Sequence, residues 1–115
     1  MRSFLYYVAH PYGGLCENRE KVQQIIQELS SKIEFADATF VSPIHQFGFT
    51  YETVSYVNGV KKCLSLLAHC DALLLTGDWK NSRGCMAEYA FAKASGIEIF
   101  DYNRRTRFGS FESVN

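Results

Sequence analysis

Phe4-Leu5-Tyr6-Tyr7-Val8-Ala9 is an unbroken run of apolar and aromatic residues near the start of a 115-residue chain. Such a run predicts a strand buried on both faces, as in the parallel sheet of an α/β protein. Ala72-Leu73-Leu74-Leu75 has the same character, and 38–42 and 97–102 are further candidate strands. We therefore expect four parallel strands.

Helical patterns lie between these strands. The segment 18–33 carries apolar residues at helical spacing, and a second helix runs from Val57 to near Cys70. A third covers 82–95 and ends at Gly96, whereas 44–51 is expected to be an irregular loop. Strands that alternate with helices predict an α/β fold with right-handed crossovers.

The chain is short enough for a single domain, which we place at 1–103. The remaining residues, 104–115, form a polar, arginine-rich tail. This tail either adds a short edge element to the sheet or stays mobile.

Composition excludes several classes of function. Twelve basic residues balance twelve acidic ones, so no basic face for a nucleic-acid polymer is expected. No stretch approaches the roughly 20 apolar residues of a membrane span. Four cysteines without CxxC pairs predict free thiols and a reducing, cytoplasmic location. No cluster has the spacing of metal ligands, and no metal or other cofactor is expected.

Polar and glycine-rich segments follow three of the predicted strands, at 10–14, 43–51 and 76–84. In open α/β sheets, ligands bind beyond the carboxyl ends of the strands. We therefore expect a small-molecule site where these three segments meet.

The segment after the third strand is the most informative. Ser82 is placed to cap the helix that follows, and the free N–H groups of a helix start attract anions such as phosphate. Arg83 and Gly84 follow directly and belong to the same candidate site. The alternative for Ser82 is a purely structural cap.

Glu88 stands out in this helix. We expect it on the flank of an apolar stripe formed by Ala87, Ala90, Phe91 and Ala94. Its carboxylate would then reach over Gly84 toward the helix start, because helical side chains lean toward the N-terminus. A partly buried carboxylate beside open space is a candidate nucleophile or base. The alternative is an exposed glutamate paired with Lys80 or Arg83.

Other loop residues are weaker candidates. Gly13 and Gly14 suit a close backbone approach to a ligand, and Tyr12 offers a ring for stacking or a hydroxyl donor. Trp79 stacks on a base or else covers the edge of the core. His10 and His45 are possible acid–base groups or simple hydrogen-bonding residues.

Taken together, the segments 7–14, 70–75 and 77–88 resemble the nucleoside 2-deoxyribosyltransferase-like superfamily. The matching residues lie in the same order and on the same elements, over 4 to about 102. The chain is most similar to a short bacterial and phage branch, related to the 2′-deoxynucleoside 5′-phosphate N-hydrolases.

This resemblance implies a flavodoxin-like, Rossmann-like three-layer sandwich with a four- to five-stranded parallel sheet, working as a homodimer or larger oligomer. It implies cleavage or transfer of the N-glycosidic bond of a nucleoside or nucleotide, with Glu88 as the nucleophile. Ser82 matches the serine that contacts the 5′-phosphate in the hydrolases, which favours a nucleotide substrate. Tyr12 and Gly13 match the loop that lines the sugar and phosphate.

One residue departs from the superfamily pattern. Active members carry an aspartate at the position of Cys63, and a thiol cannot replace its charge. Asp78 or His10 are the candidate substitutes. Three hypotheses follow: an N-glycosidase-type enzyme, a non-catalytic protein that binds or sequesters a nucleotide signal, and a structural or adaptor domain that keeps only the fold.

Overall fold

The computed structural model describes residues 2–114 and has a five-stranded sheet of order β2-β1-β3-β4-β5. The first four strands in the chain are parallel, and the last is antiparallel to its neighbour β4. Their bounds are β1 (Phe4–Ala9), β2 (Ala38–Val41), β3 (Ala72–Leu75), β4 (Glu98–Arg105) and β5 (Phe111–Ser113).

Four α-helices and three short 3₁₀ turns connect the strands. The helices are α1 (Cys16–Ser30), α2 (Pro43–Phe47), α3 (Tyr56–Leu67) and α4 (Arg83–Ser95). The turns are η1 (Ile33–Phe35), η2 (Gly48–Thr50) and η3 (Trp79–Asn81). Across residues 2–114, no helix combines the length and the apolar character needed to cross a membrane.

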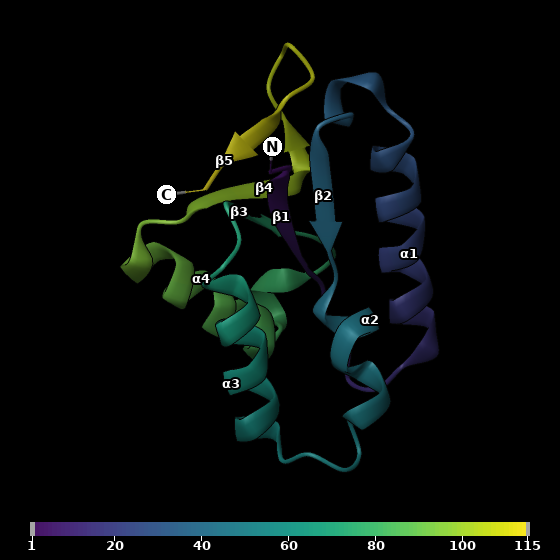
Figure 1. Cartoon of the computed structure of the whole chain (residues 1–115), viewed down its shortest axis with the longest axis vertical. Coiled ribbons are helices and arrows are strands. Elements are labelled where there is room, and N and C mark those ends of the chain that lie inside the picture. Colours follow the sequence, from purple (N-terminus) through teal and green to yellow (C-terminus); the bar gives the residue numbers. More distant parts are fainter. Residues whose placement is uncertain (1, 115) are drawn as a thin grey trace.

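The helices form a layer on each face of the sheet (Figure 1). Tyr7 and Leu73 point toward α3 and α4, whereas Val8 and Leu74 point toward α1. All four side chains are fully buried, as the unbroken apolar runs predict for strands covered on both sides. The expected three-layer α/β sandwich is confirmed, with the difference that the fifth strand is antiparallel.

The strand order creates a natural opening beside β1. The chain leaves β1 through α1 to reach β2 on one side, and then crosses through α3 to β3 on the other side. The loops after β1 and β3 therefore diverge at the carboxyl edge of the sheet. This switch point is where ligands bind in such folds.

The segment 44–51 is not the irregular loop that we expected. It forms α2 and η2, because Ser42 caps α2 by accepting a hydrogen bond from the His45 N–H at 3.2 Å, and Pro43 occupies the first turn. Serine followed by proline is a helix-start signal. The aromatic residues and Gly48 that follow made this helix-start signal difficult to recognise in the sequence.

The bounds of other elements also differ from those expected. The first helix begins at Cys16 and ends at Ser30 rather than covering 18–33, because Lys32 is extended and Ile33 starts η1. Of the two alternatives for the tail, the structure has the edge element. β4 continues to Arg105, and Phe111 of β5 stacks on Phe35 with ring centroids 5.6 Å apart.

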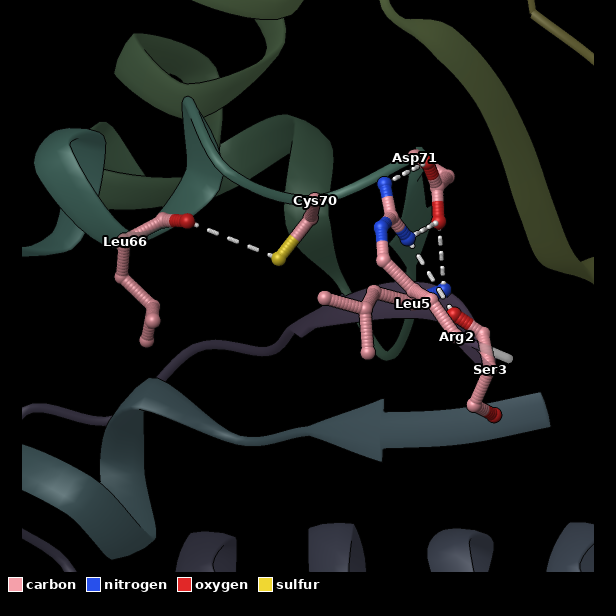
Figure 2. Close-up of polar contacts among 6 residues, drawn as sticks. All are labelled: Arg2, Ser3, Leu5, Leu66, Cys70 and Asp71. Atoms are coloured by element: carbon pink, nitrogen blue, oxygen red, sulfur yellow. Dashed lines mark hydrogen bonds and ion pairs between the residues drawn. The ribbon is translucent and has the colours of Figure 1, made fainter.

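An ion pair joins Arg2, just before β1, to Asp71, just before β3, at the amino ends of these strands. Figure 2 shows the contact. Both Arg2 Nη atoms donate to the Asp71 carboxylate at 2.7 Å, and the Leu5 N–H donates to the same carboxylate at 2.7 Å. The Arg2 and Leu5 hydrogen bonds lower the pKa of Asp71 to about 2. This contact fixes the start of the central strand pair.

We predict that Asp71→Asn lowers the melting temperature by a few degrees at pH 7, since the folded state favours the Asp71 carboxylate more than the unfolded chain does. The contribution of the ionised Asp71 to stability is fully present above the usual aspartate pKa, and it is lost as the pH falls toward about 2. The difference in melting temperature between Asp71→Asn and the parent protein should therefore shrink between pH 4 and pH 2. Thermal unfolding followed by circular dichroism measures it. Asp37→Asn, at an exposed aspartate, is the control and should show no such trend.

Candidate active site

A cleft of about 640 Å³ opens beyond the carboxyl ends of β1, β2 and β3. All three expected segments contribute to its wall, and the face of α3 completes it. The predicted residues that line it are His10, Tyr12, Gly13, Asp78, Ser82, Arg83, Gly84 and Glu88. The structure therefore brings together most of the candidate site, including both candidate catalytic carboxylates.

The carboxyl group of Glu88 lies at the inner wall of this cleft. Glu88 is only 7% exposed, and its Oε2 accepts a hydrogen bond from the Tyr7 hydroxyl of β1. Burial raises the pKa of Glu88 to about 7, although the Tyr7 hydrogen bond acts in the opposite direction. The exposed alternative, a salt bridge to Lys80 or Arg83, is not what the structure shows.

The buried face of α4 differs from the expected stripe. Ala90 and Ala94 are exposed, and the helix instead buries Cys85, Glu88 and Ala92. Glu88 thus occupies the centre of the buried face rather than its flank. A charged residue type can lie there because Tyr7 supplies a hydrogen bond inside the core.

Tyr7 is a site residue that the sequence did not identify, whereas Cys63 was noted there as the departure from the superfamily pattern. Tyr7 is fully buried, and burial together with the charge of Glu88 holds its pKa well above the usual tyrosine value. Cys63 lines the cleft from α3, and the Tyr7 hydroxyl and the Glu88 charge both act on its thiol. The available signal was that Tyr7, inside a buried run, carries a hydroxyl that needs a partner.

The start of α4 is built as expected. Ser82 caps the helix by accepting a hydrogen bond from the Cys85 N–H at 3.2 Å, which leaves the proton of its own hydroxyl available. The Arg83 guanidinium lies 5.0 Å from the ring centre of Tyr56 at the start of α3. A Cβ added at Gly84 would lie 3.5 Å from the Tyr56 hydroxyl. The starts of α3 and α4 therefore meet at the cleft beside a cation.

The opposite wall is apolar and aromatic. Tyr12 packs edge-on against Tyr51 with ring centroids 5.1 Å apart, and a Cβ at Gly48 would lie 3.1 Å from the Tyr12 hydroxyl. Ile44 and Phe47 of α2 line the same side. This wall offers surfaces for a flat ring and few charged groups.

His10 is held against the loop after β3. Its Nδ1 lies 2.7 Å from the Pro11 carbonyl oxygen, and a Cβ at Gly77 would lie 2.7 Å from its Nε2. Gly77 has φ +62°, so glycine is needed there both for the backbone and for the imidazole. Burial lowers the pKa of His10, which favours a neutral ring.

Trp79 and Gly14 do not line the cleft. Trp79 is 6% exposed, its ring lies 5.8 Å from that of Tyr89, and its indole N–H lies 3.4 Å from Asp101 Oδ2. Of the two positions open to Trp79, the structure thus has the one that covers the core. Gly14, at φ +77°, lies against the Tyr51 ring.

Two remaining candidates have partners within their own segments. Both carboxylate oxygens of Asp78 accept from Asn81 Nδ2, at 3.0 and 2.9 Å. His45 Nδ1 lies 2.7 Å from Ser42 Oγ. In the described part of the chain, no three His, Cys, Asp or Glu side chains are grouped so that they could hold a metal ion.

Comparisons with known proteins agree with this architecture. A family model described as a domain of unknown function (DUF4406) matches residues 5–101. A solved structure titled 2-desoxiribosyltransferase from Leishmania mexicana superposes with a TM-score of 0.59 at 19% identity, covering 95% of this chain and 78% of that chain. No curated protein matches. The chain therefore has the nucleoside deoxyribosyltransferase-like fold that the sequence motifs indicated.

We predict that the Glu88 carboxyl makes stability depend on pH. Because its pKa in the folded state is raised above the usual glutamate value, the folded state binds the proton more tightly than the unfolded chain. The free energy of unfolding therefore falls as the pH rises from the usual glutamate pKa through about 7, by roughly 3.5 kcal/mol at most.

Urea unfolding of the parent protein and of Glu88→Gln between pH 5 and about 8.5 measures this effect. The difference between the two isolates Glu88 from the histidines that titrate in the same range. Glu20→Gln, at an exposed glutamate on α1, should follow the parent curve. Parallel curves for Glu88→Gln and the parent would show that Glu88 has an ordinary pKa.

Proposed function

The chain belongs to the family described as a domain of unknown function (DUF4406), and we propose that it is a nucleotide N-glycosidase-type enzyme. It would cleave or transfer the N-glycosidic bond of a nucleoside or deoxynucleoside 5′-monophosphate, with Glu88 as the nucleophile. The observation that carries this proposal is the nearly buried Glu88 carboxyl, held by Tyr7 at the inner wall of a 640 Å³ cleft.

The chemistry suits a carboxylate in this position. One Glu88 oxygen attacks C1′ of the sugar while the C1′–N bond breaks, which forms a glycosyl ester and frees the base. Water, or a second base, then attacks C1′ and regenerates the carboxylate. A carboxylate nucleophile divides one difficult step at an oxocarbenium-like centre into two easier ones, as in retaining glycosidases.

Tyr7 supports this role by orienting the nucleophile. Its hydroxyl donates to Oε2, which leaves Oε1 of Glu88 for the sugar carbon. The same hydrogen bond favours the ionised form that a nucleophile needs. A glutamate with a pKa of about 7 is then ionised in a substantial fraction of molecules at neutral pH.

The 5′-phosphate would lie at the start of α4. The N–H groups of this helix start, the free proton of the Ser82 hydroxyl and the Arg83 guanidinium all favour an anion. Gly84 carries no side chain between this end and Glu88, so the phosphate and the sugar carbon can be bound together. These features favour a nucleotide over a nucleoside.

The base and sugar would occupy the other wall. Tyr12 presents a ring and a hydroxyl, Gly13 lets the backbone approach, and His10 closes the end near β3. Asp78 lines the same cleft and is the remaining candidate for a second catalytic carboxylate. The solved structure that shares the fold is titled a 2-desoxiribosyltransferase, which supports a reaction at a nucleoside sugar.

A non-catalytic protein that binds or sequesters a nucleotide signal is the second candidate. The observation that favours it is Cys63, a thiol beside Glu88 where the resembled superfamily carries an aspartate. The same cleft would then bind the nucleotide without breaking its glycosidic bond.

We further propose that the protein acts as a homodimer in the cytoplasm. Cys16, Cys63, Cys70 and Cys85 are free thiols, which suits a reducing compartment. The exposed aromatic and apolar side chains that line the cleft, Leu15, Tyr51 and Tyr56, would suit a subunit contact.

We predict that the parent protein releases free base from at least one nucleoside monophosphate and that Glu88→Ala does not. The substrates are a panel of ribo- and deoxyribonucleoside monophosphates, including modified pyrimidines, and chromatography detects the base. Glu52→Ala, at an exposed glutamate, is the control and should keep full activity. A nucleotide that raises the melting temperature without losing its base would favour the non-catalytic binder.

We predict that Arg83→Met raises KM for a nucleoside monophosphate about tenfold. A charge-assisted contact to the phosphate is worth about 1.5–3 kcal/mol, and the exposure of Arg83 to solvent puts this one at the lower end of that range. The corresponding nucleoside, which lacks the phosphate, should be nearly unaffected. Lys93→Met in the last turn of α4 removes a positive charge far from the helix start and is the control. Equal losses for nucleotide and nucleoside would argue against a phosphate at this helix start.

A further inference from the structure

The titratable groups around Glu88 are all weak acids. Burial, and in addition the charge of Glu88, raises the pKa of four neighbouring side chains, which are Tyr7, Cys63, Cys85 and Tyr56. Each of them carries a hydroxyl or a thiol. Within residues 2–114, burial and the Tyr7 hydroxyl account for the pKa of Glu88, and no second charged group contributes.

A general acid needs a pKa near the working pH and a proton within reach of the leaving atom. The Tyr7 hydroxyl already donates its proton to Glu88. The Cys85 thiol has a pKa of about 12, mainly because it is buried, and a protonated thiol such as Cys63 is a weak donor. None of these groups is suited to protonate a departing base.

The histidine, the aspartate and the two cations of the lining are no better placed. A neutral His10 whose Nδ1 donates to the Pro11 carbonyl has no proton left on Nε2. The Asp78 carboxylate is an acceptor for the Asn81 amide. Lys62 and Arg83 are the cations of the lining, and the Arg83 guanidinium lies over the Tyr56 ring at the start of α3, 5.0 Å from its centre.

We propose that this site expels the base without a proton from the protein, so that its substrates are nucleotides whose base is a good leaving group. This inference rests on the proposed function of Glu88 as nucleophile. Cys63 determines this specificity, since it occupies the space beside Tyr7 and Glu88 that an acidic side chain could fill.

A Glu88 oxygen forms a bond to C1′ while the C1′–N bond breaks, and its electron pair goes to the base nitrogen. The base leaves as an anion and takes a proton from water in the open cleft. Water then attacks C1′ of the ester, which returns the Glu88 carboxylate, the sugar phosphate and a proton to solvent. Bases whose N–H is more acidic therefore leave faster.

The test is a series of 2′-deoxyuridine 5′-monophosphates with fluoro, bromo, hydrogen or methyl at C5, whose bases become weaker acids in approximately that order. The full-length protein is used, and base release is measured at saturating and at low substrate. We expect kcat/KM to fall by about tenfold for each unit of increase in the pKa of the free base, because no acid offsets the developing charge.

Two variants distinguish the role of Cys63. Cys63→Ser keeps a small neutral side chain and should keep the steep dependence, whereas Cys63→Asp adds an acid and should flatten it by raising rates on the poorest leaving groups. Melting temperatures and nucleotide-induced stabilisation show whether each variant is folded. If Cys63→Asp does not fold, the slope of the parent protein alone decides.

If kcat/KM of the parent protein falls by less than about twofold for each unit of increase in the pKa of the free base, the inference is overturned, since an acid of the protein would then assist departure of the base. In that case the proposed nucleophile would still be supported if Glu88→Ala abolishes base release. If no nucleotide in the series loses its base while another monophosphate of the wider panel does, the inference fails and the proposed function stands; if none of the wider panel does either, both fail.

Discussion

The hydrogen bond from Tyr7 to Glu88 is the contact on which the arrangement of the site depends. It crosses the interior from the inner strand β1 to the first half of α4, and both residues are almost completely buried. Burying a carboxyl without a partner is costly, so α4 can place Glu88 on its packed face only where a donor meets it. The same contact fixes the position of the carboxyl relative to the helix start at Ser82. A change at Tyr7 or Glu88 should therefore affect both the stability of the core and the chemistry of the cleft.

The strand order accounts for the space in front of that carboxyl. Since the connections from β1 and β3 leave the sheet in different directions, their loops separate and leave an opening at the switch point. The short helices α2 and η2 then supply an apolar wall, and the starts of α3 and α4 supply a polar one. At the amino ends of β1 and β3, the Arg2–Asp71 ion pair links the two strands. The sheet is therefore stabilised at the end that lies away from the cleft.

Much of this could be predicted from the sequence, because the strongest signals were local. The apolar strands β1 and β3, the Ser82 cap and the Gly96 helix end each follow from a few adjacent residues, although only the second half of β1 is buried. What could not be predicted depends on contacts between distant segments. Glu88 was expected on the flank of α4, since the period of the alanines gives no sign that Tyr7, 81 positions earlier, supplies a hydrogen bond. Trp79 illustrates the same limit, because only the fold decides between the cleft and the core.

The identity of the nucleophile is the central claim, and trapping the covalent intermediate tests it most directly. A nucleoside monophosphate with fluorine at C2′ of the sugar slows the breakdown of a glycosyl ester, because fluorine destabilises the oxocarbenium-like transition state. After incubation, we expect the mass of the intact protein to rise by that of the fluorinated sugar phosphate, and peptide mapping to find the addition on Glu88. An adduct on another residue, or base release from unmodified substrate with no adduct at all, would contradict the account.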